Sequence, residues 1–149
     1  MPGFSKKRWR WFRNRAVMSS SGARFYTLGY LGRTLPEVAA ILEERNAMLA
    51  DIRLVPYSRN KAFIKAVLER TLGPRYVWVR ALGNLNYKTG GPVALADYTM
   101  GRTAILALDT PVVLMCACRD YGRCHRAVVA EALRAEGFSV EEIPLSHPE

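Results

Sequence analysis

Residues 112–118 read V-V-L-M-C-A-C and follow Pro111. A strand with one face in water alternates apolar and polar residues, whereas a strand covered on both faces is apolar throughout. The seven-residue run is almost uninterrupted, and it therefore predicts a buried strand with helices packed on both sides of its sheet.

Outward from this run, the chain alternates short β-rich segments with amphipathic ones. The predicted strands are 24–30, 48–55, 75–81, 112–118 and 138–143. The predicted helices are 35–46, 60–72, 92–108 and 123–136, the first with Thr34 as its N-cap. Five strands alternating with helices predict an α/β, three-layer sandwich with a mostly parallel sheet, Rossmann-like in organisation.

Length and composition narrow the class of protein. The 149 residues suit one domain, and with half of them apolar the chain is not disordered throughout. Its apolar runs are shorter than the roughly 18–20 residues of a membrane span, and no signal peptide is visible. Three cysteines, an odd number, argue against a secreted disulfide framework. We therefore expect a cytoplasmic protein with reduced thiols and no membrane partner, and its oligomeric state stays open.

Basic residues concentrate at the start of the chain. The net charge is +9, and residues 6–13 read K-K-R-W-R-W-F-R, with no acidic residue before Glu37. Cations interleaved with aromatic rings can neutralise phosphates and stack on bases. We divide the chain into a basic aromatic tail, 1–23, and a single α/β domain, 24–149. The tail is either a nucleic-acid-binding arm or a solvated extension, and in the second case Met18 is a possible true start.

Polar residues gather where the predicted strands end, and in parallel sheets ligands bind at those carboxyl ends. Several cations lie there or at the start of the last helix, namely Arg33, Arg53, Arg59, Arg123, His125 and Arg126. Guanidinium groups round one cleft repel one another without an anion, and a helix N-terminus attracts one. A nucleotide or nucleic-acid phosphate is the expected ligand, although pairing with Asp51 or Asp120 would also satisfy some of these cations.

Asp51 is the one carboxylate at a predicted strand end inside this basic cluster. It could activate water or stabilise the positive sugar formed when a glycosidic bond breaks. An ion pair that merely orients Arg53 is the alternative. Tyr30, Trp78 and Tyr87 could stack on an extruded base, and Asn84 or Asn86 could bond its polar edge, although such aromatics often belong to the core.

Four soft-metal ligands lie within ten positions: Cys116, Cys118, Cys124 and His125. Zinc or iron could use them, but the spacing C-x-C-x5-C-H lacks a second paired knuckle, so we expect no cofactor. Cys124 near a helix N-terminus could instead be a thiolate nucleophile. A phosphatase loop needs five residues between Cys and Arg, and Cys118 to Arg123 is one residue short.

Five segments in order resemble the DUF488 family, small proteins without an assigned function. They are Y-T-L-G-Y-L-G-R-T (26–34), D-I-R-L-V-P-Y-S-R (51–59), Y-V-W-V-R-A-L-G (76–83), A-D-Y-T-M (96–100) and C-A-C-R-D-Y-G-R-C-H-R (116–126). The resemblance spans 24–145 and implies an α/β sheet. It implies as shared residues Asp51, Arg53, Ser58, Arg59, Cys116, Cys124, His125 and Arg126. Cys118 departs from the family pattern, which usually has an acidic residue there, and Asn84 stands where a second Gly is common.

Together these patterns predict an enzyme that acts on a damaged or modified base in nucleic acid, most concretely a DNA glycosylase cleaving the base–sugar bond. The candidate catalytic residues are Asp51, Arg53, Cys124 and His125. The candidate substrate-binding residues are Tyr30, Arg33, Ser58, Arg59, Trp78, Asn84, Asn86, Tyr87, Arg123 and Arg126. Two alternatives remain: a Cys- or metal-dependent small-molecule enzyme, phosphatase- or sulfurtransferase-like, and a non-catalytic nucleic-acid-binding module.

Overall fold

The computed structural model describes residues 23–145, which form a five-stranded sheet in which every strand pair is parallel. The strands are β1 (Phe25–Gly29), β2 (Met48–Asp51), β3 (Tyr76–Trp78), β4 (Val112–Cys116) and β5 (Val140–Glu142), in the order β3-β2-β4-β1-β5. The predicted fold class is confirmed. The predicted basic tail, except for Ala23, lies outside the described residues.

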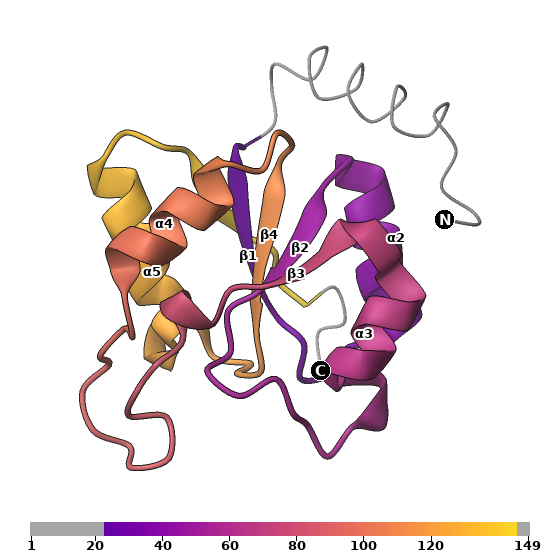
Figure 1. The fold of residues 1–149 in the computed structure, drawn as a ribbon, viewed down its shortest axis with the longest axis horizontal. Helices are drawn as coiled ribbons and strands as arrows, with labels where there is room; N and C mark the ends of the chain where they lie inside the picture. The colour runs from indigo at the N-terminus through magenta and orange to yellow at the C-terminus, as the bar shows by residue number, and fades with distance from the viewer. Residues whose placement is uncertain (1–22, 146–149) are drawn as a thin grey trace.

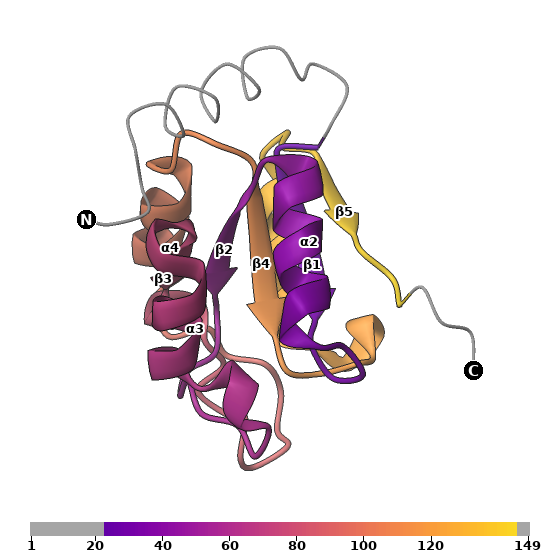
Figure 2. The ribbon, with the colours of Figure 1, turned by 90° about the vertical axis from the view of Figure 1, so that its right-hand side faces the viewer.

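Helices cover both faces of the sheet, which gives three layers (Figure 1). One face carries α2 (Leu35–Arg45) and α3 (Lys65–Leu72), and the other carries α4 (Tyr98–Leu106) and α5 (His125–Ala135). Figure 2 shows β2, β4 and β5 pointing the same way beside α2 and α3. No helix among residues 23–145 is long and apolar enough to cross a membrane.

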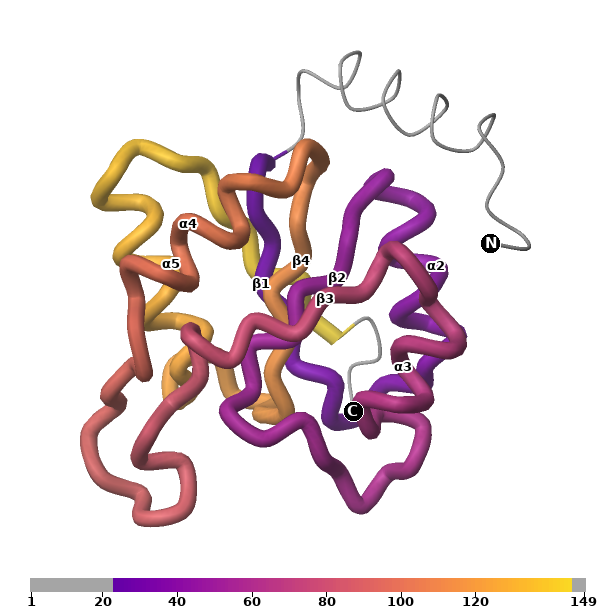
Figure 3. The backbone as a smooth tube through the Cα atoms, viewed as in Figure 1, coloured from indigo at the N-terminus to yellow at the C-terminus, as the bar shows by residue number. Residues whose placement is uncertain are grey.

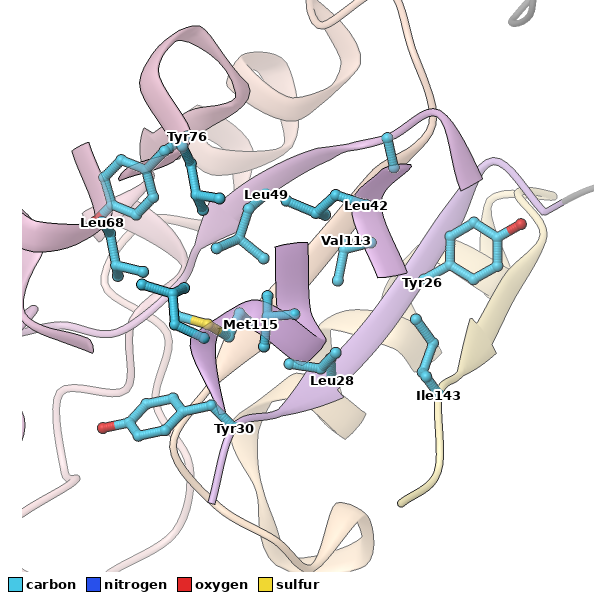
Figure 4. Packing of buried hydrophobic residues seen from close by; sticks show 14 of the residues in the cluster. Tyr26, Leu28, Tyr30, Leu42, Leu49, Leu68, Tyr76, Val113, Met115 and Ile143 are labelled. Atoms are coloured by element: carbon cyan, nitrogen blue, oxygen red, sulfur yellow. The ribbon is translucent and has the colours of Figure 1, made fainter. Parts of the chain in front are cut away.

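The central strand β4 divides the core into two halves, and all five of its residues are buried. Val113 and Met115 pack in the cluster under α2 and α3, whose labelled members gather on one side of the sheet in Figure 4. Val112, Leu114 and Cys116 pack in the cluster under α4 and α5. The apolar run 112–118 predicts this strand correctly, although the strand ends at Cys116.

Local side-chain bonds explain where the elements begin and end. Helix α2 starts as predicted, because Thr34 Oγ1 accepts from the Glu37 amide (3.2 Å) and Glu37 Oε1 accepts from the Thr34 amide (2.8 Å). Strand β2 stops at Asp51, short of the predicted end at 55, because Asp51 Oδ1 accepts from the Arg53 amide and turns the chain.

Two predicted helices are wrong in extent. The segment predicted as helix 60–72 is split by the extended residue Ile64 into a 3-10 turn, η1 (Lys61–Phe63), and α3. The helix predicted over 92–108 begins at Tyr98. The Asn84 side chain instead holds the preceding segment as a loop, since its Oδ1 accepts from the amides of Asn86 and Ala94.

Candidate functional site

A cavity of about 430 Å³ opens beyond the carboxyl ends of β2 and β4, within the roughly 300–1,000 Å³ typical of small-molecule sites. Its lining residues lie in four segments, 53–57, 84–93, 116–118 and 123–125. Figure 3 shows these parts of the chain at the same end of the sheet. The predicted position of the site, at the carboxyl edge of a parallel sheet, therefore coincides with a real cavity.

Two cysteines and a histidine form one wall of this cavity. Cys116 is the last residue of β4, Cys124 is the N-cap of α5, and His125 is the first residue of that helix. The Sγ atoms of Cys116 and Cys124 are 2.6 Å apart, and Cys124 Sγ is 3.7 Å from His125 Nδ1. A 3-10 turn, η4 (Tyr121–Arg123), returns the chain from the strand to the helix and so brings the two thiols together.

The His125 ring has a defined orientation. Its Nε2 lies 2.8 Å from the carbonyl oxygen of Ile52. A carbonyl oxygen only accepts, so Nε2 carries a proton and donates it, and Nδ1 is the ring nitrogen that faces Cys124. The histidine thereby also ties the start of α5 to the segment that follows β2.

The two thiols ionise very differently. Hydrogen bonds from the thiols of Cys116 and Cys118, together with His125 and the Arg126 amide, lower the pKa of Cys124 far below its ordinary value despite its burial. The pKa of Cys116 is raised well above the ordinary value by hydrogen bonds with Cys118 and Cys124 and by burial. Of the two thiols, Cys124 at the positive end of a helix dipole is therefore the one that ionises more readily.

Arg126 is 0% exposed and hydrogen-bonds to the segment that carries the cysteines. Its Nη1 donates to Cys116 Sγ (3.1 Å) and to the Cys118 carbonyl (2.8 Å), while Nη2 pairs with Glu142 at 2.9 Å. It does not line the cavity. In place of the predicted contact with a substrate phosphate, the structure gives Arg126 the role of a buried brace between the β4 loop and β5.

Asp51 is also fully buried and does not line the cavity. Its Oδ1 accepts from Arg53 Nε (2.8 Å), and its Oδ2 accepts from Arg53 Nη2 (2.6 Å) and from the Tyr76 hydroxyl (2.6 Å). Burial and this hydrogen bond hold the pKa of Tyr76 well above its ordinary value. Of the two interpretations left open, the geometry is that of an ion pair orienting Arg53, whose side chain does reach the cavity.

Other predicted residues do face the cavity. The Arg123 side chain is 88% exposed, with Asp120 Oδ2 3.6 Å from its Nε, and Tyr87 is also exposed. The amides of Asn84 and Asn86 line the cavity but also hold its loop, since Asn86 Nδ2 donates to the Pro92 carbonyl (2.7 Å). Tyr57, also exposed on this wall, was not predicted, although its place in the segment after β2 was the available signal.

The remaining predicted residues lie elsewhere. Tyr30 is buried and stacks on Phe63 with centroids 4.2 Å apart, and the Trp78 Nε1 donates to the Arg53 carbonyl (2.8 Å). Both therefore pack and brace the fold rather than stand free for a base. Arg33 is buried and donates to two backbone carbonyls. Ser58 and Arg59 line a second cavity of about 410 Å³, together with Tyr30 and Cys118.

The predicted metal ligands come together in part. Ligand atoms of Cys116, Cys124 and His125 all lie within 4.8 Å of one another, a donor set that suits zinc or iron. Two thiolates on one tetrahedral zinc, each bonded at about 2.3 Å, keep their sulfurs roughly 3.8 Å apart. At 2.6 Å the two sulfurs are much closer than that, so this geometry favours direct contact between thiols over a shared ion.

Comparison with known proteins finds a family match for part of the chain. No curated protein and no solved structure matches it. One family model, Domain of unknown function DUF488, matches residues 35–90. The matched segment contains Asp51, Arg53 and the loop of Asn84, and it ends before β4 and the cysteines. The predicted resemblance to DUF488 is thus confirmed over residues 35–90.

Proposed function

We propose that this protein is a cysteine-dependent enzyme in which the Cys124 thiolate attacks a small anionic substrate held in the 430 Å³ cavity. One observation carries the proposal: Cys124 Sγ lies at the N-terminus of α5, in contact with the Cys116 thiol, on the cavity wall. We place the enzyme in the cytoplasm, where a reducing poise keeps such thiols free.

The charge of the lining supports an anionic substrate. Arg53 and Arg123 both reach the cavity, and among the described residues that line it none is Asp or Glu. Asp51 balances the charge of Arg53, whereas the exposed Arg123 has only the looser contact with Asp120. The first amides of α5, that of Arg126 among them, add a positive potential at Cys124 itself.

In the proposed substitution reaction, Cys124 is the nucleophile and Cys116 is the proton donor. A bond forms between Cys124 Sγ and the electrophilic atom of the substrate, and the leaving group departs with the bonding electron pair. Cys116, whose Sγ lies 2.6 Å from Cys124 Sγ, is placed to supply its proton to the leaving group. A phosphatase-type loop does not fit, because Arg126 is buried against Glu142 and not aimed at the cavity.

Alkylation as a function of pH tests the proposal. Iodoacetamide should modify Cys124 at a rate that is nearly flat between about pH 6 and 9, whereas an ordinary thiol with a pKa of about 8.5 gains roughly tenfold per pH unit. Peptide mass spectrometry assigns the modified residue, and the rate at the exposed Cys118 in the same digest is the internal reference. Modification of Cys124 no faster than Cys118 at about pH 6 would contradict the proposal.

A second candidate is the base-cleaving enzyme acting on DNA, favoured by the exposed rings of Tyr57 and Tyr87 on the same cavity as Arg123. In this candidate Asp51 acts through Arg53, because both of its oxygens are already bonded. Oligonucleotides carrying a panel of modified bases, analysed by mass spectrometry, test it: a released base supports base cleavage, and unchanged oligonucleotides refute it. Salt-sensitive binding that falls on deletion of residues 1–17 would identify the tail as the nucleic-acid-binding arm.

A further inference from the structure

Cys116 is placed to react with whatever Cys124 captures. The two sulfurs, 2.6 Å apart, need to move only about 0.5 Å closer to reach the roughly 2.05 Å of a disulfide. They come from different elements, the end of β4 and the start of α5, and both side chains line the same cavity. A nucleophile with a second thiol in contact has a built-in partner for a second displacement.

Arg126 is a second, independent observation. Its Nη1 donates to Cys116 Sγ at 3.1 Å, so the guanidinium is placed to stabilise negative charge that develops on that sulfur. When Cys124 is capped by a substrate group, this contact with Arg126 stays in place and favours attack by the Cys116 sulfur.

We propose that Cys116 is a resolving cysteine and that the substrate is a small anion containing a sulfur–sulfur bond. This inference rests on the proposed nucleophilic role of Cys124. Because the capped Cys124 Sγ is itself part of a sulfur–sulfur bond, it is the electrophile that a neighbouring thiolate displaces most readily.

The reaction proceeds in two displacements. The Cys124 thiolate attacks one sulfur of the substrate R–S–S–R′, the S–S bond breaks, and R′S⁻ leaves. Cys116 then gives its proton to the departing thiolate and attacks Cys124 Sγ, so that RS⁻ leaves and a Cys116–Cys124 disulfide forms. The two thiols lose two electrons, and these reduce the substrate to two thiols. A separate dithiol reductant then restores the resting enzyme.

Tetrathionate is a suitable probe, because it is a small dianion whose central S–S bond reacts with thiolates. Reduced full-length protein should lose two hydrogens, show a peptide linking Cys116 to Cys124, and release both halves of the probe as thiosulfate. Cys116→Ser should stop halfway and keep a thiosulfate group on Cys124. Cys118→Ser removes the third cysteine of the chain, so the linked peptide should still join Cys116 to Cys124, and circular dichroism should show that each variant is folded.

The outcomes separate this inference from the proposed function. If wild-type Cys124 keeps the thiosulfate adduct while Cys116 stays free, the resolving role is wrong and the nucleophile survives. A disulfide joining Cys124 to Cys118 instead also overturns the resolving role. If Cys124 captures nothing in the folded wild type, the proposed function fails as well. Stoichiometric zinc or iron in the purified protein that blocks the reaction until it is chelated would replace both with a metal site.

Discussion

Replacing Asp51 by asparagine tests whether that carboxylate is structural. The side chain keeps its shape but loses the charge that faces Arg53, and its amide N–H groups cannot accept from Arg53 or from the Tyr76 hydroxyl. Removing one partner of a buried ion pair costs about 3–5 kcal/mol, a large part of the roughly 5–15 kcal/mol that stabilises a domain. At roughly 3–4 °C per kcal/mol for a chain of this size, Tm should fall by about 10–20 °C.

Urea unfolding followed by circular dichroism measures the effect, and a double-mutant cycle identifies its cause. Asp51→Asn leaves the Arg53 guanidinium buried without a counter-charge, so adding Arg53→Met should restore part of the lost stability. The expected coupling free energy is about 1–3 kcal/mol. A loss below about 1 kcal/mol in Asp51→Asn, or simple additivity of the two substitutions, would refute the assignment of a stabilising buried pair.

The same variant decides between the two interpretations of Asp51. Below its melting temperature, folded Asp51→Asn should still capture tetrathionate on Cys124, because the carboxylate does not line the cavity. A folded Asp51→Asn variant that has lost all activity, whether on a sulfur substrate or on a modified base, would show that the carboxylate takes part in the chemistry.

Three further substitutions test other parts of the structure. Gly29→Ala should abolish soluble folding, since an added Cβ would overlap the Cys118 carbonyl oxygen, and a normal melting curve would contradict that packing. The lowered pKa of Cys124 stabilises the fold fully above the ordinary thiol pKa, and this contribution is lost as the pH falls towards the pKa of the folded state. The free energy of unfolding of the wild type relative to Cys124→Ser should therefore rise between about pH 6 and 9, by up to about 1.4 kcal/mol per unit, and a flat difference in denaturation would count against a thiolate. Arg123→Ala should change the free energy of unfolding by less than about 0.5 kcal/mol. At low salt it should slow the capture of tetrathionate several-fold but leave the reaction with a neutral disulfide at the wild-type rate. Equal effects on the two probes would contradict a role of Arg123 in attracting anions.

Elements were predicted correctly where residues close together in the sequence determine them. The apolar run 112–118 and the Thr34–Glu37 capping pair sufficed for the central strand and for the first helix. Residues 92–97 were predicted as helix because nothing near them in sequence shows that Asn84 holds the loop. That bond joins residues ten positions apart, so it belongs to the tertiary structure and not to the local sequence.

The edge of the sheet that carries the site was predictable, but the direction of each side chain was not. Asp51 and Ile52 point to opposite faces of the sheet. The hydrogen-bond partner of Asp51 is Tyr76 in the neighbouring strand, and nothing in the sequence near Asp51 indicates on which face that hydroxyl lies. For Arg126 a signal was present, since it shares a helical face with the apolar Val129 and Ala130. Heptad-like spacing thus marks it as an inward-facing residue, despite its charge.

The order of the strands has a consequence for how the chain reaches its native state during synthesis. Neither β1 nor β2 bonds to the other, and both are held by β4, which is translated some sixty residues after β2. A nascent chain that has not yet emerged from the ribosome as far as Pro111 can form only the β2–β3 ladder of this sheet. β5 pairs only with β1 and follows β4 in the chain, so it joins the sheet later still. Most of the sheet therefore assembles only after residues 112–116 have been synthesised, and earlier fragments expose apolar strand faces that a chaperone would have to shield.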